Sequence, residues 1–296
     1  MNARIISNEE IDRKKWDDSL LNFTGSLIYS QSFFFFAMCK WDALVVGDYE
    51  ALMPLPNRKK WKINYLYQPA FTQQLGIIGN VETDAALEIV SQKYPFAEIA
   101  LNHNNSTGKI FKPCNNFILN LSAAYKNIKA GYSSSLKSNL NWLQKFELNY
   151  SAGNGYYEAV DLFQSLYGKK MSSVTAEDYT NFKTLCSQLY TSDNLVLRTA
   201  TAQNNQLAAL VLMLKDKNRL YNVISCSTDF GRSRQANYFI YDKIIEEFSG
   251  SGLIFDFEGS DIKGIADFYK KFGTINQPYP FIKWNNLPAI VKFLKK

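Results

Sequence analysis

Three short apolar runs follow one another closely in the C-terminal half of the chain, and they restrict how this half can fold. The runs cover 194–202, 206–214 and 219–227, with the polar pair Asn204 and Asn205 between the first two. Short apolar runs separated by polar turns predict an antiparallel meander of strands. The elements expected after the meander are a polar loop at 229–235, a helix at 236–248, a strand from Leu253, a helix at 262–272, a strand at 279–284 and a terminal helix from Leu287.

The N-terminal half repeats this order of elements less clearly. A helix is expected at 9–21, and a hairpin around Gly47 and Asp48 joins strands at 43–46 and 50–55. The elements expected next are a strand at 61–67, a loop at 68–76, a helix at 82–93, and strands at 97–101 and 117–121. The repeated order predicts an α/β (α+β) class with two tandem domains, each a mixed, mostly antiparallel sheet flanked by helices.

Helices are expected between the two halves. Three serines at 133–135 can cap a helix there. The apolar face of this helix carries Leu136, Leu140, Leu143 and Phe146. Two more helices are expected at 156–167 and 177–189. We therefore expect an N-terminal domain over 1–150 and a C-terminal domain over 151–296 that carries the active site.

The residue counts exclude several kinds of chemistry. The chain of 296 residues has a single histidine, His103, so triads that need a histidine base are not expected. The four cysteines are widely separated and form no CxxC pair, and no metal site is predicted. Neither a GxxxxGK[ST] nor a GxGxxG motif follows an expected strand, which argues against P-loop and Rossmann folds.

Charge and hydropathy indicate the compartment and the partners. The net charge of +6 is spread along the chain, which permits an anionic partner but lacks the dense basic stripe of a DNA-binding protein. The N-terminus has no apolar signal core, and the apolar run at 33–38 is too short to span a bilayer. We therefore expect a cytoplasmic protein with no transmembrane segment and no DNA partner.

Two carboxylates stand in or beside the apolar strand that begins at Leu253. Asp256 and Glu258 are expected on one face of it, because strand side chains alternate. A carboxylate in an apolar strand costs free energy unless it is used, so either residue is a candidate general base for an amine. The alternatives are that both are paired with Lys or Arg, or that Glu258 caps the helix that follows.

The order of meander, loop, helix, strand and helix resembles the GNAT acyltransferase fold. In that family a loop before a helix N-terminus holds the pyrophosphate of acyl-CoA. The matching cofactor-binding positions here are Gly231, Arg232, Ser233, Arg234, Gln235 and Ala236. This segment departs from the usual R/Q-x-x-G-x-G/A form because no glycine follows Arg234 at the right spacing. Tyr269 stands where many GNAT enzymes place a tyrosine that protonates the leaving thiolate.

The whole chain is similar, more specifically, to the FemABX peptidyltransferase-like branch. The tandem order carries this resemblance, together with the motifs QPAFTQQLG at 68–76, GYSSSLKSNLNW at 131–142, FDFEGS at 255–260 and FYKKFG at 268–273. Well-known members transfer amino acids from aminoacyl-tRNA to a peptidoglycan precursor, and other relatives are acetyltransferases. Some members carry a coiled-coil arm for tRNA, whereas this chain shows no sustained heptads.

These resemblances, with the residues, lead to one expected function and two alternatives. We expect an acyltransferase that moves an acetyl-like group from acyl-CoA to a small-molecule or peptide amine, with Asp256, Glu258 and Tyr269 as catalytic residues. The expected substrate-binding residues are Tyr67, Phe71, Gln73, Gln74 and Lys137. The first alternative is an aminoacyl-tRNA-dependent peptidyltransferase that acts on a cell-wall peptide. The second is a degenerate GNAT-like module that binds a ligand without chemistry.

Overall fold

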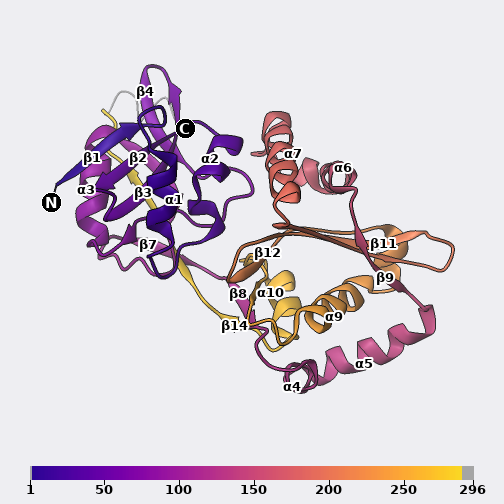
Figure 1. Ribbon diagram of the computed structural model, residues 1–296. Helices are drawn as coiled ribbons and strands as arrows, with labels where there is room; N and C mark the ends of the chain where they lie inside the picture. Colours follow the sequence, from indigo (N-terminus) through magenta and orange to yellow (C-terminus); the bar gives the residue numbers. More distant parts are fainter. Residues whose placement is uncertain (1, 289–296) are drawn as a thin grey trace. The chain divides into compact units, whose positions relative to one another are not determined.

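The computed structural model describes residues 2–288, and the chain divides into two compact units (Figure 1). The first unit comprises Met1–Cys114 with Pro278–Lys296, and the second comprises Asn115–Gln277. The chain therefore leaves the first unit once and returns to it near its end. The boundary expected near residue 150 falls within strand β9 (Asn149–Gly153), which pairs with strand β10 (Leu195–Thr201) inside the second unit.

An eight-stranded sheet forms the centre of the first unit. Seven strands run in the order β1-β2-β3-β4-β6-β15-β7, and β5 pairs with β3. Among the described strands of this sheet, only β4 and β6 pair in parallel. The strands are β1 (Ala3–Ser7), β2 (Trp41–Val46), β3 (Ala51–Lys60), β4 (Ile63–Tyr67), β5 (Ile78–Gly79), β6 (Phe96–Ala100), β7 (Phe111–Cys114) and β15 (Tyr279–Asn285).

Among the described residues, three α-helices accompany this sheet: α1 (Arg13–Leu20), α2 (Ser32–Met38) and α3 (Thr83–Lys93). Helix α1 begins later than the predicted residue 9, because the Asp12 side chain caps it by accepting from the Lys15 N–H. The aromatic rings of Trp16, Phe35 and Trp41 are fully buried, and the Trp41 ring lies 5.1 Å from each of the other two. This aromatic packing joins α1 and α2 to β2.

The second unit contains a seven-stranded sheet in the order β14-β8-β13-β12-β11-β10-β9. Only the β12–β13 pairing is parallel. Besides β9 and β10, the strands are β8 (Phe117–Asn120), β11 (Leu207–Lys215), β12 (Arg219–Ser227), β13 (Ile254–Asp256) and β14 (Ile275–Asn276). The α-helices are α4 (Tyr125–Ala130), α5 (Ser134–Leu143), α6 (Tyr156–Tyr167), α7 (Ala176–Thr191), α8 (Asp229–Ser233), α9 (Ala236–Phe248) and α10 (Lys263–Lys270).

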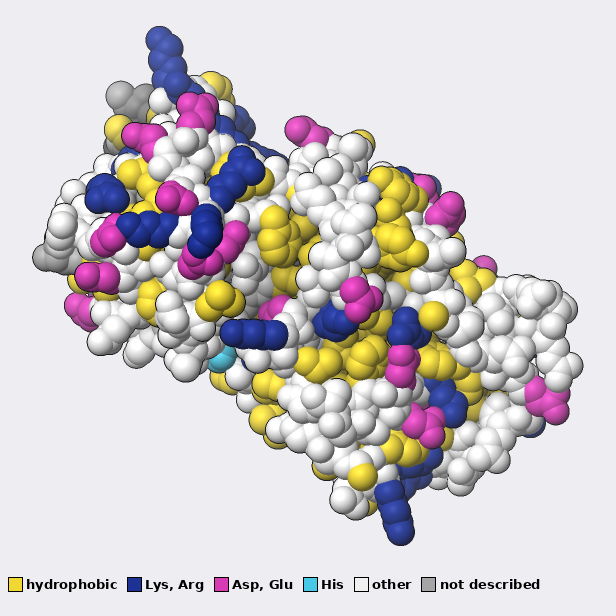
Figure 2. All heavy atoms as spheres, in the orientation of Figure 1, with side chains coloured by type: hydrophobic (Ala, Val, Ile, Leu, Met, Phe, Trp, Pro, Cys, Tyr) yellow, Lys and Arg dark blue, Asp and Glu magenta, His cyan; other side chains and the backbone are white. Residues whose placement is uncertain are grey.

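Helices cover both faces of this second sheet (Figure 1). Helices α9 and α10 lie on one face, with α5 against α9, while α6 and α7 lie on the other. One continuous apolar core joins α5, α9 and α10 to β8, β11, β12 and β13. Figure 2 shows the outside of this face, where Lys and Arg side chains lie among hydrophobic ones over α9 and α10. Strand β13 therefore lies between its neighbouring strands in the sheet, and the helices of this core pack on its face.

The predicted fold class is confirmed, because each unit is a mostly antiparallel sheet flanked by helices. Two strands belong to a different sheet from the one that their place in the chain indicated. The strand expected at 117–121 is β8 of the second unit, and the strand expected at 279–284 is β15 of the first. Hydrophobic periodicity identifies a strand but not its neighbours in space. The terminal helix expected from Leu287 falls, beyond Pro288, outside the described residues.

Candidate active site in the second unit

The parallel strands β12 and β13 are paired over only a short distance. Three residue pairs join them, from Arg219 opposite Ile254 to Tyr221 opposite Asp256. Strand β13 ends at Asp256, whereas β12 continues to Ser227, and among the described strands that part of β12 pairs only with β11. Beyond Tyr221, the described part of β12 therefore has no partner strand on the side of β13.

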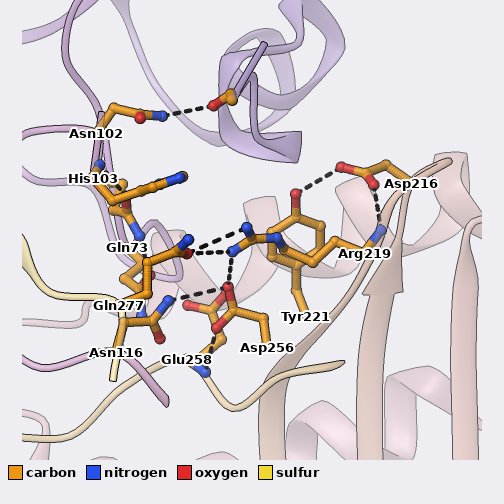
Figure 3. A network of polar contacts seen from close by, with 12 residues as sticks. Gln73, Asn102, His103, Asn116, Asp216, Arg219, Tyr221, Asp256, Glu258 and Gln277 are labelled. Carbon is orange, nitrogen blue, oxygen red and sulfur yellow. Dashed lines mark hydrogen bonds and ion pairs between the residues drawn. The ribbon is translucent and has the colours of Figure 1, made fainter. Parts of the chain in front are cut away.

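Asp256 stands at this divergence and is almost fully buried, at 1% exposure. Figure 3 shows its carboxylate among three donors. Its Oδ2 accepts from Arg219 Nη1 at 2.6 Å and from Asn116 Nδ2 at 3.2 Å, and its Oδ1 accepts from the Glu258 N–H at 2.9 Å. Both carboxylate oxygens therefore have partners. Asp256 is paired with an arginine, which is the alternative that the sequence left open. Its geometry suits it to holding the strand end in place.

The partner of Asp256 is itself held by several contacts. Arg219 is 6% exposed, and its Nη1 and Nη2 donate to Gln277 Oε1 at 3.2 and 3.3 Å. Asp216 accepts from the Arg219 N–H at 2.8 Å and from the Tyr221 hydroxyl at 2.6 Å (Figure 3). Burial alone lowers the pKa of the guanidinium, but the charge of Asp256 opposes it and the net direction is upward. Arg219 therefore remains charged.

Glu258 lies in a turn after β13. The alternation of side chains along the strand, from which its orientation was predicted, therefore does not extend to Glu258. Its φ of 61° is left-handed, and Gly259 follows at 62°. A non-glycine residue in this region is strained, and such strain clusters at functional sites. The hydrogen bond from its N–H to Asp256 holds the turn, and its side chain is partly exposed. The structure thus distinguishes a buried carboxylate, Asp256, from a partly exposed one, Glu258.

Tyr269, on α10, completes the cluster. It is 9% exposed, and its ring lies 4.8 Å from that of Phe257. Burial raises its pKa well above the ordinary value, and Tyr241, Glu258 and Asp256 act in the same direction. Its ring also lies 6.4 Å from that of Tyr241 on α9. The three expected catalytic residues therefore lie at one place, with a neutral phenol beside a carboxylate.

The segment expected to hold a pyrophosphate folds differently from the predicted loop. Most of 229–235 is helix α8, whose Thr228 cap accepts from the Gly231 N–H at 3.1 Å. A Cβ on Gly231 would come within 1.9 Å of the Ala208 carbonyl oxygen, so this glycine serves the close approach of α8 to β11. Gln235 then adopts a left-handed φ of 55° and begins α9 with Ala236.

Both arginines of this segment make contacts within it. Arg232 Nη1 donates to the Ser227 carbonyl at 2.6 Å, and its Nη2 pairs with Asp229. Arg234 Nη1 donates to the Phe230 carbonyl at 3.2 Å and to the Ser233 hydroxyl at 3.1 Å, with its guanidinium 3.8 Å from the Phe230 ring centroid. No side chain caps the first turn of α9. The arginines therefore reinforce α8.

Four of the expected substrate-binding residues belong to the first unit. Tyr67 ends β4 with the Arg58 guanidinium 4.1 Å from its ring centroid, and it lines a cavity of about 260 Å³. Phe71 has a left-handed φ of 56°. Gln74 is 1% exposed, and its amide donates to Gln73 Oε1 at 2.6 Å. The two glutamines are thus hydrogen-bonded neighbours in a loop, and Tyr67 lines a pocket on β4.

The remaining expected residue, Lys137, lies on α5 in the second unit. Its Nζ donates to the Ala130 carbonyl at 2.8 Å, which ties α5 to the end of α4. Among the described residues, no group of three or more His, Cys, Asp or Glu side chains is placed to hold a metal ion. Across the same residues, none of the helices is long and apolar enough to cross a bilayer.

Sequence reasoning missed the residues that support the site. Arg219 and Asn222 are polar residues in a largely apolar strand, and this signal is present in the sequence. Asn116 and Gln277 stand in turns at the two ends of the second unit, where nothing local marks them. Tyr241 shares the apolar face of α9 with core residues, so its periodicity conceals its hydroxyl.

Comparisons with known proteins identify the fold. No family model matches the chain, and no curated protein matches it. Among solved structures, FemX aligns over the full length of both chains with a TM-score of 0.67 and 12% identity. L-PGS from Bacillus licheniformis aligns over 96% of this chain and 95% of its own, with a TM-score of 0.53 and 10% identity.

A third structure agrees with these two. The C-terminal domain of a candidate lysylphosphatidylglycerol synthetase from Agrobacterium fabrum aligns over 97% of this chain and 95% of its own, with a TM-score of 0.52 and 12% identity. The fold is therefore that of FemX and of these proteins, and the FemABX-like fold expected from the sequence is confirmed. At such low identity the likeness concerns the fold, and no residue role is transferred from it.

Proposed function

We propose that the chain is a transferase that forms an amide bond between an activated acyl group and an amine, at the end of β13. The observation that carries this proposal is the arrangement of Glu258 and Tyr269 beside the divergence of β12 and β13. A partly exposed carboxylate, a neutral phenol and a strand stretch without a partner strand can serve acyl transfer to an amine.

Each group has one role in the reaction. Glu258 takes a proton from the amine as the amine nitrogen attacks the acyl carbon. The open edge of β12 offers N–H groups to the acyl oxygen. Tyr269 gives its proton to the leaving atom when the old bond breaks, and the protonated Glu258 restores that proton. Asp256 and Arg219 keep the turn at Glu258 in place. Positioning of the two substrates supplies most of the rate.

Three observations favour an aminoacyl ester, as in aminoacyl-tRNA, over acyl-CoA as the donor. The segment 231–236 is folded as a helix with both arginines engaged. The raised pKa of Tyr269 makes it a weak acid, which suits protonation of an alkoxide, a stronger base than a thiolate. One structure of the same fold bears the name lysylphosphatidylglycerol synthetase, whose product carries a lysyl group.

Acyl-CoA is the second candidate donor, because one feature of the structure favours it. The 13-residue helix α9 begins without a side-chain cap, so N–H groups of its first turn are available to a phosphate. The donors differ in a measurable way, since a tRNA carries many more phosphates than CoA and its binding weakens steeply with salt.

A two-donor transfer assay tests the proposal. Purified protein receives either radiolabelled aminoacyl-tRNA or radiolabelled acetyl-CoA, together with a library of peptide and small-molecule amines. We expect amide-linked label from aminoacyl-tRNA, with Glu258→Gln reducing it, and binding of that donor that weakens as salt rises. Transfer from acetyl-CoA alone would establish the second candidate. Label in neither arm would overturn the proposal and favour a ligand-binding module without chemistry.

A further inference from the structure

The end of the hairpin formed by β3 and β4 carries four cations and a tryptophan in sequence. These residues, here called the basic tip, are Arg58, Lys59, Lys60, Trp61 and Lys62. All five are exposed, and Trp61 is 58% exposed. Figure 1 shows the end of this hairpin, beside the label of β4, projecting from the first unit, and Figure 2 shows Lys and Arg side chains at the same place. Over the part of the chain that the structure describes, no lysine of the basic tip is in an ion pair.

The turn at the basic tip is made of residues that its geometry disfavours. Lys60 pairs with Ile63, so Trp61 and Lys62 form a two-residue turn, and their φ angles are 49° and 66°. Positive φ at both central residues is the pattern of a type I′ turn, in which Asn-Gly is the favoured pair. A side chain at either position is strained, because the left-handed region brings its Cβ too close to the backbone. Trp61 and Lys62 therefore weaken the hairpin, which indicates a role outside the fold.

One face of the hairpin joins these cations to apolar side chains. Arg58 lies opposite Tyr65 and Lys60 lies opposite Ile63, and residues directly opposite one another share a face of a sheet. The Lys60 ammonium lies 4.9 Å from the Trp61 ring centroid. Lys60 and Trp61 also line the cavity of about 260 Å³ beside β4, whose walls include Ile63 and Tyr65. Positive charge and apolar surface are thus adjacent at the end of the hairpin.

The carboxylate that lines the same cavity does not neutralise the basic tip. Glu98 on β6 is paired with Lys283 on β15, with 2.5 Å between its Oε1 and the lysine Nζ. The Arg58 guanidinium contacts the Tyr67 ring, as described above, and a cation over a ring keeps its charge. The basic tip therefore presents a net positive charge to its surroundings.

Two observations favour a bilayer with anionic lipids over a nucleic acid as the partner. The basic tip is the projecting end of a hairpin, whereas proteins that bind single-stranded nucleic acid use a basic groove that follows the backbone. Such grooves also present several aromatic rings to successive bases, whereas the basic tip has one ring, that of Trp61. Tryptophan beside lysine is typical of the membrane–water interface, where the ring meets acyl chains and the cation meets phosphates.

We propose that the basic tip docks the first unit on a membrane surface that contains anionic lipids. Trp61 enters the boundary between headgroups and acyl chains, where both its apolar ring and its N–H have suitable surroundings. The lysines bind lipid phosphates, and each adds to the affinity. Binding is peripheral and reversible, and it weakens as salt screens the charges. It does not depend on the proposed transferase reaction, so its test needs no acyl donor.

Cosedimentation of the full chain with vesicles tests the electrostatic part. The vesicles contain phosphatidylcholine alone, or phosphatidylcholine with about one third phosphatidylglycerol. We expect binding to the anionic vesicles that weakens with salt, and binding at least tenfold weaker to the neutral ones. Lys59→Gln/Lys62→Gln is expected to weaken binding to anionic vesicles about tenfold or more. Equal binding to both kinds of vesicle would overturn the inference.

A matched pair of substitutions controls for net charge. Lys169→Gln/Lys170→Gln also removes two exposed positive charges, but in the second unit. We expect this variant to bind anionic vesicles with an affinity within about twofold of the wild type, since its lysines lie outside the basic tip. If it loses as much affinity as Lys59→Gln/Lys62→Gln, the attraction is a property of the whole charge and the inference is wrong.

The turn itself offers a variant that separates loss of binding from loss of the fold. Trp61→Asn/Lys62→Gly gives the turn its favoured residues, so we expect a higher unfolding midpoint together with vesicle binding that is weakened tenfold or more. The control is Trp142→Ala on α5, because Trp142 is also exposed, at 39%, and the Lys145 ammonium lies 4.3 Å from its ring centroid. Wild-type affinity in the turn variant, or an equal loss in Trp142→Ala, would contradict docking through the tip.

Two further measurements identify what the tip binds. Lipids with brominated acyl chains quench the fluorescence of an inserted tryptophan, and we expect quenching in the wild type that is lost in Trp61→Phe. Quenching that persists in Trp61→Phe would overturn the insertion of Trp61. Filter binding of tRNA to Lys59→Gln/Lys62→Gln tests the nucleic-acid alternative. Weakened tRNA binding in this variant, with no binding of the wild type to anionic vesicles, would show that the tip is an RNA site and overturn the inference.

Discussion

Asp256 shows that a charged residue in an apolar strand has two physical explanations, and its neighbours decide between them. Arg219, Asn116 and the N–H of Glu258 occupy its oxygens, so it is a structural anchor for the turn. The sequence offered Asp256 and Glu258 as equal candidates for a base. Only the parallel register of β12 and β13, which pairs Tyr221 with Asp256, brings Arg219 within reach. Local periodicity could not supply that information.

Removal of the charge on Asp256 is expected to destabilise the second unit strongly. Asp256→Asn leaves the buried Arg219 guanidinium unpaired, which costs about 3–5 kcal/mol in the free energy of unfolding. Asp193→Asn is the control, because Asp193 pairs with Lys215 through a side chain that is 97% exposed, and we expect a loss below about 1 kcal/mol. Urea denaturation measures both variants. Equal losses would contradict the anchoring role of Asp256.

Asp242 is a second buried carboxylate, and it makes stability depend on pH. Burial raises its pKa above the ordinary 3.8, although the Tyr125 hydroxyl, which donates to Oδ1 at 2.9 Å, acts in the opposite direction. The native state therefore binds this proton more tightly than the unfolded state does. The contribution of Asp242 to stability is largest below pH 3.8 and is lost as pH rises through the raised native pKa.

Comparison with Asp242→Asn isolates this effect. We expect the difference in free energy of unfolding, wild type minus variant, to fall as pH rises from below 4 and then to become constant. Urea denaturation across a pH series measures it. A difference that rises with pH would show that the native pKa of Asp242 is lowered instead.

At the scale of the elements, sequence patterns predicted most of the second unit. The predicted bounds of β12, α6 and α9 agree with the structure, since strong periodicity and flanking turns define them. The stretch 229–235 was predicted as a loop because it is short and polar. Its helix α8 depends on the Thr228 cap and on contact between Gly231 and Ala208, which lie far apart in sequence. Tertiary packing decides such short elements.

Two helical glycines are expected to respond in opposite ways to alanine. Gly231→Ala places a methyl group against the Ala208 carbonyl, so α8 must move, and we expect a loss of about 2 kcal/mol or more. Gly264→Ala in α10 meets no atom within 4 Å, and alanine's higher helix propensity is expected to stabilise by about 0.5–1 kcal/mol. Thermal unfolding of the two variants checks both signs. Stabilisation by Gly231→Ala would contradict the close approach.

At the scale of the whole molecule, each half of the sequence contributes a strand to the sheet that the other half mainly forms. Strand β8 precedes most of the second unit yet pairs with β13 and β14, and β15 returns to pair with β6 and β7. The sequence predicted these strands and the FemABX-like fold, but it placed both in the wrong half. The choice of partner depends on long-range pairing, which no local pattern encodes.

The central claim is that Glu258 acts as the base for transfer to an amine at the end of β13. Its most direct test is the single-turnover rate of Glu258→Gln with bound radiolabelled aminoacyl-tRNA and a saturating amine acceptor. Glu147→Gln, which changes an exposed glutamate of the same unit, is the control. We expect a loss of about 100-fold or more for Glu258→Gln and none for Glu147→Gln. A wild-type rate in Glu258→Gln would contradict the claim.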